Sequence, residues 1–355
     1  MFNRPLIAID IGSSCIKVVE LSGQKHKVLR AVGLETLPNG AVSDGVINDQ
    51  NVVEEVLKSL LKKLKISTTG RRAAISLGGS SVVIKKILVG AAKDTDIAEQ
   101  VFYEAEQHLQ ADMSELFFDY QEVGVPDPQN GEVPVILCGA KRDMVEQYLA
   151  AIRSVGMRCG VVDCDVFSTS NMFEYNYGVV PGLAAIINVG ASTTQVSVVA
   201  GGEYLYTRDV PIGGDEYTYQ ISEVLGIDQG NAETLKVAAS LGDNSAPQEL
   251  QQVIGDLNDQ LVSEIQMTLD YFSQSGEVSL EDSKMNNLFL TGGSSRVLGL
   301  DAALAAAVQV PVQILNPFQN IEVNPKKFQM NYILMQGHLY GVAVGLGMRA
   351  MSDNE

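Results

Sequence analysis

The chain has 355 residues and a formal net charge of −18, with 25 basic against 43 acidic residues. Such a negative field repels phosphate backbones, so we expect no nucleic-acid partner. A hydrophobic fraction of 46% and a charged fraction of 19% are typical of a folded protein and not of a disordered chain. The length predicts more than one domain.

The same sequence gives no sign of export or of insertion into a membrane. No run approaches the ~18 uninterrupted apolar residues of a transmembrane helix, and the first residues lack a signal-peptide cleavage pattern. The four cysteines have neither the Cys-x-x-Cys spacing of a metal site nor a disulfide framework, which suits a reducing compartment. We therefore expect a cytoplasmic protein with no direct membrane insertion.

Apolar spacing predicts mixed helices and strands in the first half of the chain. A helix is expected over 52–64 and a strand over 72–77. Residues 82–158 are then expected to form a separate inserted unit with the order strand, helix, strand, strand, helix. Its predicted elements are strand 82–89, helix 97–108, strands 116–123 and 133–140, and helix 143–155.

The second half repeats this mixed α/β character. We expect a strand over 203–210, then three helices, and a strand that ends in a Gly-Gly turn. A Gly- and Ala-rich helix is expected near the end of the chain. The predicted ranges are helices 216–225, 232–239 and 249–271, strand 285–290, and helices 299–307 and 337–351.

One pattern occurs twice, about half a chain apart. Residues 6–18 read LIAIDIGSSCIKV, and residues 184–196 read AAIINVGASTTQV. In both, an apolar strand contains an acid or amide near its end and is followed by small polar residues and then by a second β-prone run. This order is typical of a β-hairpin. Two such hairpins indicate a duplicated core whose halves face one another.

Hairpin tips of this composition can bind an anion through successive backbone N–H groups. We expect the two tips to hold a triphosphate from opposite sides, with Lys17 as a nearby positive charge. Asp10 and Asn188, at the strand ends, would reach Mg²⁺ directly or through its waters. The expected phosphate contacts are Gly12, Ser13, Ser14, Gly190, Ser192 and Thr193.

Other motifs are less specific. The TGGSS run at 291–295 could place a nucleotide at a helix N-terminus, or it could simply turn the chain, and it is no Walker A loop. The GGD run at 213–215 equally fits a turn with a helix N-cap. Either Asp163 or Asp165 could orient a water, although helix capping is the alternative. The three histidines are isolated, so no triad or metal site is predicted.

In order and spacing these motifs resemble the actin-like ATPase superfamily, its FtsA branch, and within that branch the PilM family of type IV pilus assembly proteins. The resemblance covers essentially the whole chain. Its motifs are DIGSSCIKVVEL at 10–21, LPNGAVSDGVI at 37–47, DYQ at 119–121, GGD at 213–215 and AETLK at 232–236.

The resemblance implies an α/β, actin-like ATPase fold, with a duplicated ribonuclease-H-like core and an inserted FtsA-type subdomain. The implied first lobe combines 1–81, 159–180 and 331–355, and the insert is 82–158. The implied second lobe combines 181–212 and 286–330, with a helical subdomain, 213–285, over the nucleotide.

The resemblance also assigns a binding site for ATP and Mg²⁺. It places Asp10 and Asn188 at the metal and gives Asp165 a catalytic role. Relatives commonly have Asp where this chain has Asn188, and an amide should weaken metal capture, so turnover is expected to be weak at most. The implied ATP-binding residues are Asp10, Gly12, Ser13, Ser14, Lys17, Asn188, Gly190, Ser192, Thr193, Thr194, Gly213, Gly214, Glu233, Lys236, Gly292, Gly293 and Ser294.

The implied function is an ATP-binding adaptor at the cytoplasmic face of the inner membrane. In the family, a groove beside the inserted subdomain holds the N-terminal cytoplasmic peptide of PilN, and pilus motor components are further possible partners. One alternative is a small-molecule kinase of the same superfamily, which needs a carboxylate base and a second substrate pocket. Another is an FtsA-like division protein, for which a basic amphipathic helix is expected near the end of the chain.

Overall fold

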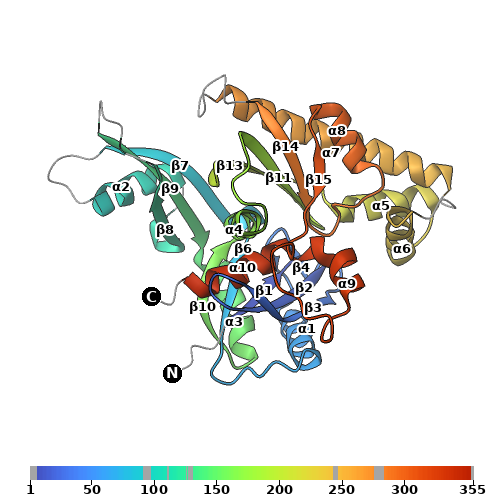
Figure 1. Ribbon diagram of the computed structural model, residues 1–355, viewed down its shortest axis with the longest axis horizontal. Helices are drawn as coiled ribbons and strands as arrows, with labels where there is room; N and C mark the ends of the chain where they lie inside the picture. Colours follow the sequence, from blue (N-terminus) through green and yellow to red (C-terminus); the bar gives the residue numbers. More distant parts are fainter. Residues whose placement is uncertain are drawn as a thin grey trace.

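The computed structural model describes residues 6–90, 97–109, 112–124, 126, 131–242, 247–275 and 284–352. Across these residues the strands form two five-stranded sheets, one three-stranded sheet and one short two-stranded hairpin. Figure 1 shows the two larger sheets on either side of the helices α4 (Asp165–Tyr177) and α10 (Gly341–Ser352), with the three-stranded sheet projecting at one end.

The first large sheet has the strand order β10-β6-β1-β2-β3. β1 and β2 form an antiparallel hairpin in which Asp10 pairs with Lys17, and β6 runs parallel to β1. Two helices, α1 (Gln50–Lys63) and α3 (Arg142–Ser154), pack their apolar stripes on one face of this sheet. The strands are β1 (Ile7–Ile11), β2 (Cys15–Ser22), β3 (Val28–Thr36), β6 (Arg72–Leu77) and β10 (Arg158–Cys164).

The second large sheet repeats this topology, with the order β13-β12-β11-β14-β15. β11 and β12 form the matching antiparallel hairpin, and β14 runs parallel to β11 as β6 does to β1. The duplication predicted from the repeated pattern is confirmed by these two pairings. The strands are β11 (Leu183–Val189), β12 (Thr194–Ala200), β13 (Glu203–Val210), β14 (Met285–Thr291) and β15 (Val312–Ile314).

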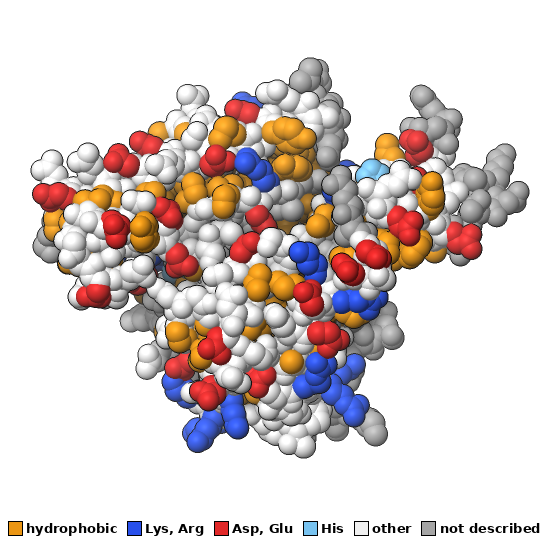
Figure 2. All heavy atoms as spheres, turned by 180° about the vertical axis from the view of Figure 1, so that it is seen from behind, with side chains coloured by type: hydrophobic (Ala, Val, Ile, Leu, Met, Phe, Trp, Pro, Cys, Tyr) orange, Lys and Arg blue, Asp and Glu red, His pale blue; other side chains and the backbone are white. Residues whose placement is uncertain are grey.

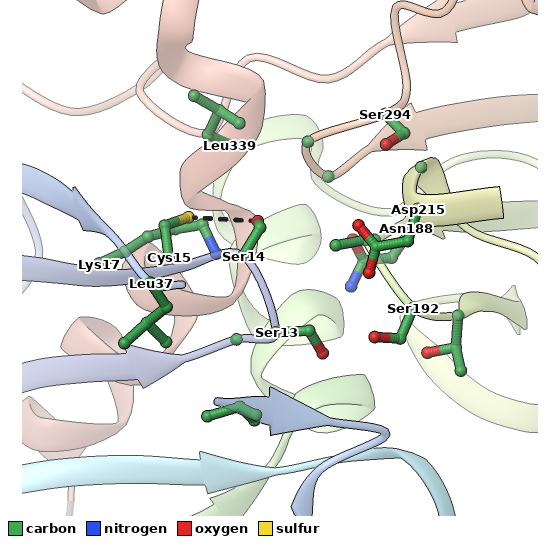
Figure 3. Close-up of a pocket in the computed structure, with 18 of the residues that line it drawn as sticks. Ser13, Ser14, Cys15, Lys17, Leu37, Asn188, Ser192, Asp215, Ser294 and Leu339 are labelled. Atoms are coloured by element: carbon green, nitrogen blue, oxygen red, sulfur yellow. Dashed lines mark hydrogen bonds between the residues drawn. The ribbon is translucent and has the colours of Figure 1, made fainter. Parts of the chain in front are cut away.

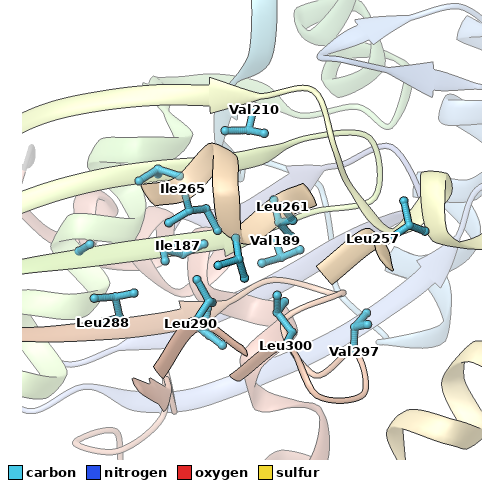
Figure 4. Close-up of a cluster of buried hydrophobic side chains, with 14 of the residues drawn as sticks. Ile187, Val189, Val210, Leu257, Leu261, Ile265, Leu288, Leu290, Val297 and Leu300 are labelled. Carbon is cyan, nitrogen blue, oxygen red and sulfur yellow. The ribbon is translucent and has the colours of Figure 1, made fainter. Parts of the chain in front are cut away.

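A hydrophobic core stabilises the outer face of the second sheet. Strand residues such as Ile187 and Leu290 pack against Leu261 and Ile265 of α7 and Leu300 of α8 (Figure 4). Burying each such side chain contributes about 1.5–3 kcal/mol. The helices over this half are α5 (Gly214–Leu225), α6 (Gln229–Ser240), α7 (Gln248–Gln274) and α8 (Leu300–Val308).

α4 and α10 form a layer between the two large sheets. One buried cluster joins Ala8 of the first sheet, Phe289 of the second, and Met172 and Val344 of these two helices. The helices cross closely, because a Cβ at Gly345 would lie 1.7 Å from the carbonyl oxygen of Ser168. The Gly- and Ala-rich composition of the last helix thus permits close contact with α4.

The three-stranded sheet has the order β7-β9-β8, and helix α2 packs on it. The expected strands and first helix of the inserted unit are therefore present, with β7 and β8 at the edges. The last expected helix is present as α3 (Arg142–Ser154), but it packs elsewhere, because it buries Val145, Tyr148 and Ile152 in the core of the first large sheet. The elements are β7 (Val82–Gly90), α2 (Ile97–Leu109), β8 (Leu116–Glu122) and β9 (Glu132–Lys141).

Some elements were not predicted from the sequence. They include β3, a partly exposed edge strand, the three-residue β15, and the short helix α9 (Met330–Gln336). The hairpin of β4 (Val42–Ser43) and β5 (Val46–Ile47) was also missed, since each strand has only two residues. The last predicted helix begins as a 3₁₀ turn, Gly337–Tyr340, before α10.

Basic side chains gather at one end of the surface. Figure 2 shows Lys and Arg side chains gathered at the lower end of the molecule, where α1 lies in Figure 1. Lys62, Lys63 and Lys65 are exposed at and just after the end of α1, as a solvated helix end should be. Among the described helices, none is both long and apolar enough to cross a membrane.

Candidate nucleotide site

The two repeated hairpins meet at one large cavity, of about 960 Å³, between the two halves of the molecule (Figure 3). Each tip is closed by the same backbone hydrogen bond. The Gly12 N–H donates to the Cys15 carbonyl at 3.1 Å, and the Gly190 N–H donates to the Thr193 carbonyl at 2.9 Å. The structure therefore brings together the two tips that sequence reasoning placed on opposite sides of one ligand.

The first tip contributes an ion pair and small polar side chains. Lys17 lies opposite Asp10 in the hairpin register, and its Nζ is 3.0 Å from Asp10 Oδ2. Burial alone would lower the pKa of Lys17, but the charge and hydrogen bond of Asp10, together with smaller contributions from other groups, outweigh burial, so the pKa of Lys17 is raised. Lys17 consequently stays positive beside Ser13 and Ser14, which also line the cavity.

The second tip is held from behind by the start of α5. Asn188, Gly190, Ser192 and Thr193 all line the cavity. The backbone N–H of Gly214 donates to the Gly190 carbonyl at 3.0 Å, and that of Asp215 donates to the Ala191 carbonyl at 2.8 Å. α5 therefore fixes the position of this tip.

Two residues expected to contact ATP do not line the cavity. Thr194 is fully buried, and its hydroxyl donates to the Ile212 carbonyl at 2.7 Å. Its side chain points away from that of Thr193 because successive residues in a strand face opposite sides. Gly213 is the N-cap of α5 and packs under the second tip, so a Cβ there would lie 2.3 Å from the Ala191 carbonyl oxygen. Both residues support the tip instead.

The TGGSS run forms a third wall. Gly292, Gly293 and Ser294 line the cavity directly after β14. The Ser294 N–H donates to the Val189 carbonyl at 2.9 Å, which connects this loop to the second hairpin. The Gly292 N–H donates to the His338 carbonyl, also at 2.9 Å. Burial, with a smaller contribution from Arg296, lowers the pKa of His338 to about 4, so its imidazole is neutral at pH 7.

Glu233 and Lys236, on α6, lie at the helical side of the cavity. Lys236 is buried, and its Nζ donates to the Gly214 carbonyl at 2.8 Å and lies 2.6 Å from the Glu233 carboxylate. Thr218 of α5 donates to the same carboxylate. These contacts connect α6 to α5, so the ammonium of Lys236 is already paired within the protein.

Asp165 begins α4 and faces the cavity from the first half. Its carboxylate packs so closely on Gly78 that a Cβ there would lie 2.3 Å from Asp165 Oδ2. Burial, and then the negative charge of Asp10, raise the pKa of Asp165 from 3.8 to about 7. A carboxyl with this pKa can exchange a proton with a water molecule near neutral pH.

Several lining residues were missed by sequence reasoning. Asp215 follows Gly213 and Gly214 in the GGD run and lies beside Asn188 and Ser192 in Figure 3. Burial raises its pKa, while Lys236 acts in the opposite direction. Asp44, at the turn between β4 and β5, also lines the cavity. The only signal for Asp215 was its position after the Gly-Gly pair.

Duplicated hairpin sheets on either side of one cavity define an actin-like ATPase fold. Solved structures agree: the MreB5 protein of Spiroplasma citri bound to AMPPNP is 13% identical and superimposes with a TM-score of 0.51, covering 97% of this chain and 95% of that one. The PilM–PilN type IV pilus biogenesis complex superimposes with a TM-score of 0.86 at 23% identity, covering 99% of both chains.

Sequence comparison gives the family. The model of the family described as type IV pilus assembly protein PilM matches residues 8–351, so the chain belongs to that family. The cell division protein FtsA of Staphylococcus epidermidis is 23% identical over 366 residues, covering 88% of this chain and 74% of that protein. FtsA of Pseudomonas aeruginosa is 22% identical over 406 residues, with 99% and 91% covered.

Proposed function

We propose that this member of the PilM family is an ATP-binding adaptor of the type IV pilus inner-membrane platform. It binds the N-terminal cytoplasmic peptide of a PilN-like inner-membrane protein and hydrolyses ATP slowly or not at all. The observation that carries the nucleotide part is the pair of equivalent Gly-Ser tips facing one cavity of about 960 Å³.

The electrostatics of the tips support a phosphate ligand. The chain carries a net charge of −18, yet the first tip holds Lys17 in its charged form. Charge-assisted hydrogen bonds from backbone N–H groups and hydroxyls contribute ~1.5–3 kcal/mol each. Several such bonds from two opposed tips are enough to bind a triphosphate at cellular concentrations.

The chemistry of the donors fits Mg²⁺ bound together with the nucleotide. Mg²⁺ usually keeps several waters and takes one or two protein oxygens plus phosphate oxygens. Asp10 and Asn188 occupy matching positions near the ends of β1 and β11, and both line the cavity. Bound there, the ion would neutralise phosphate charge, and these two side chains would hold it directly or through water.

Slow turnover follows from the charge of the same residues. Asn188 supplies an amide oxygen where the matching residue of the first hairpin, Asp10, supplies a carboxylate, so the second hairpin adds no negative charge to the metal environment. Asp165 is the candidate base, but its raised pKa leaves only part of the population ionised near pH 7. We expect a rate at or below the ~1 s⁻¹ lower end of common enzyme turnover.

We place the binding site for the PilN-like peptide on the three-stranded sheet and the adjoining first half. Among the described residues, β7 and β8 are the edge strands of this sheet, and an extended peptide can lengthen such an edge by backbone pairing. Val83 and Leu88 on β7 and Phe117 on β8 are exposed apolar side chains that could receive those of a peptide. The solved PilM–PilN complex shares this fold over nearly its full length.

Calorimetry with Mg-ATP tests the nucleotide site. In Gly12→Ala the new Cβ meets only ordinary contacts but lies 3.5 Å from Lys17 Nζ and 3.9 Å from Asp10 Oδ1, in the space for phosphate and metal. We expect at least a roughly tenfold loss of ATP affinity (~1.4 kcal/mol) with folding retained. The control is Gly255→Ala in α7, where a Cβ meets nothing within 4 Å. A wild-type protein without affinity for adenine nucleotides at millimolar concentration would refute the site.

A second experiment tests the partner site separately. Leu88→Glu should abolish binding of a PilN-like peptide and leave ATP affinity within about threefold (~0.7 kcal/mol). Leu334→Glu on α9 is the matched control, since Leu334 is similarly exposed, at 59% against 61% for Leu88. Crosslinks from the peptide should fall on the three-stranded sheet and the adjoining first sheet. Crosslinks confined to residues 213–285 would contradict this location.

A further inference from the structure

Two of the four cysteines lie next to each other although they are 26 positions apart in the chain. The Sγ atoms of Cys138 and Cys164 are 3.0 Å apart. The other two cysteines are placed differently: Cys15 is buried at the start of β2, and the thiol of Cys159 donates to the Val161 carbonyl at 3.2 Å. Cys138 and Cys164 are therefore a specific pair.

The pair lies where the three-stranded sheet joins the first half. Cys138 is in β9, the central strand of that sheet, opposite Ile84 of β7 and Asp119 of β8. Cys164 ends β10 and is the N-cap of α4. The next residue, Asp165, forms part of the wall of the nucleotide cavity. A bond between the two sulfurs would connect the small sheet covalently to that wall.

The environments of the two thiols differ in a way that suits stepwise oxidation. Cys138 is half-buried and can meet a small oxidant, whereas Cys164 is buried. The hydrogen bond with Cys138, together with burial, raises the pKa of the Cys164 thiol well above its usual range. Cys138 is thus the thiol that is oxidised first, and Cys164 is the resolving thiol.

We propose that Cys138 and Cys164 form a redox-responsive dithiol that closes to a disulfide and fixes the three-stranded sheet to the first half of the molecule. With hydrogen peroxide as oxidant, the Cys138 thiolate attacks one peroxide oxygen. Cleavage of the O–O bond gives a sulfenic acid, and the departing hydroxide takes up a proton to become water. The Cys164 sulfur then attacks the Cys138 sulfur and expels a second water. Two thiols lose two electrons and peroxide gains them.

Little movement is needed for this bond. A disulfide has an S–S distance of about 2.05 Å, so the sulfurs must approach by about 1 Å. A dithiol reductant reverses the reaction by thiol–disulfide exchange. This inference does not depend on ATP or on a PilN-like partner, because it rests on the two thiols and their location.

The first test is treatment of the full-length protein with hydrogen peroxide, followed by intact mass measurement and non-reducing peptide mapping. We expect a loss of two hydrogens, one disulfide joining Cys138 to Cys164, and recovery with dithiothreitol. Cys138→Ser and Cys164→Ser should each abolish the disulfide, and in Cys164→Ser dimedone should trap a sulfenic acid on Cys138. Cys159→Ser, the matched control, should behave as wild type. Disulfides to other cysteines, or over-oxidation without a disulfide, would overturn the proposal.

The second test asks whether the bond restrains the sheet. Amide hydrogen exchange in β9 and at the start of α4 should slow by roughly tenfold or more in the oxidised protein, because the cross-link removes opened states. Exchange in α7, on the far half, should not change. If β9 and α4 exchange equally in oxidised and reduced protein, the disulfide does not fix the sheet and the proposal is wrong.

Discussion

Replacing Asp165 by Asn should stabilise the protein, and by an amount that depends on pH. The Asp165 carboxyl is packed against Gly78 and lies near Asp10, so its charged form is poorly solvated and repelled. Both effects raise its pKa from 3.8 to about 7. An amide of nearly the same shape removes the charge and keeps the packing.

The magnitude follows from linkage between proton binding and folding. Between pH 4 and pH 7 the folded protein binds the Asp165 proton more tightly than the unfolded chain does. The stability that the Asp165 proton contributes to the folded protein is therefore fully present below about pH 4. It is lost as the pH rises to about 7, where the folded protein also gives up this proton. The pKa of Asp165 differs by about three units between the folded protein and the unfolded chain, which corresponds to at most about 4 kcal/mol in the free energy of unfolding. Since the carboxylate keeps some contact with water in the cavity, we expect about 2 kcal/mol.

Urea unfolding of wild type and Asp165→Asn, without nucleotide, measures this difference. The variant should gain about 2 kcal/mol relative to wild type on going from about pH 4 to about pH 8, with nearly all of the gain reached by pH 7. The control is Asp256→Asn, at an exposed position on α7. A stability difference between Asp165→Asn and wild type that stays constant across this range would refute the argument.

The repeated hairpins are the part of the site that local sequence determines most completely. Each has an apolar strand, a turn of small residues and a second β-prone run within 13 residues. These features set strand pairing and turn position without help from the rest of the chain. Duplication then implies that the tips face one another, which is why Gly12 and Gly190 were predicted to lie across one cavity.

Long-range packing explains what the sequence did not reveal. The apolar stripe of α3, with Tyr148 and Ile152, indicates that one helix face is buried, but it does not say against which sheet. Pairing of β6 with both β1 and β10 brings that helix to the first large sheet. In the same way, Asp215 enters the cavity because α5 begins directly behind the second tip.

Motif membership alone also assigned too many residues to the ligand. Thr193 and Thr194 are neighbours in one motif, yet only Thr193 lines the cavity. Thr194 begins β12, where side chains alternate between the two faces of the sheet. Applying this alternation to the motif would have separated the two threonines before the structure was known.

Two further substitutions test the site and the core of the second half. Asn188→Asp should strengthen Mg²⁺-dependent ATP binding and raise the slow hydrolysis rate, because it adds a carboxylate beside the phosphates; unchanged metal dependence in calorimetry would show that this position does not influence the ion. Tyr217→Phe should lower the free energy of unfolding by about 1–3 kcal/mol. The fully buried Tyr217 hydroxyl donates to Asn258 Oδ1 at 2.9 Å inside the core against α7, and its removal leaves that oxygen without this donor and away from water. Tyr219→Phe, two residues along α5 at a position 47% exposed, should change stability by less than about 0.5 kcal/mol. Urea unfolding of Tyr217→Phe and Tyr219→Phe at the same pH tests this prediction. Equal losses of unfolding free energy would mean that the buried hydrogen bond contributes no more to stability than an exposed hydroxyl.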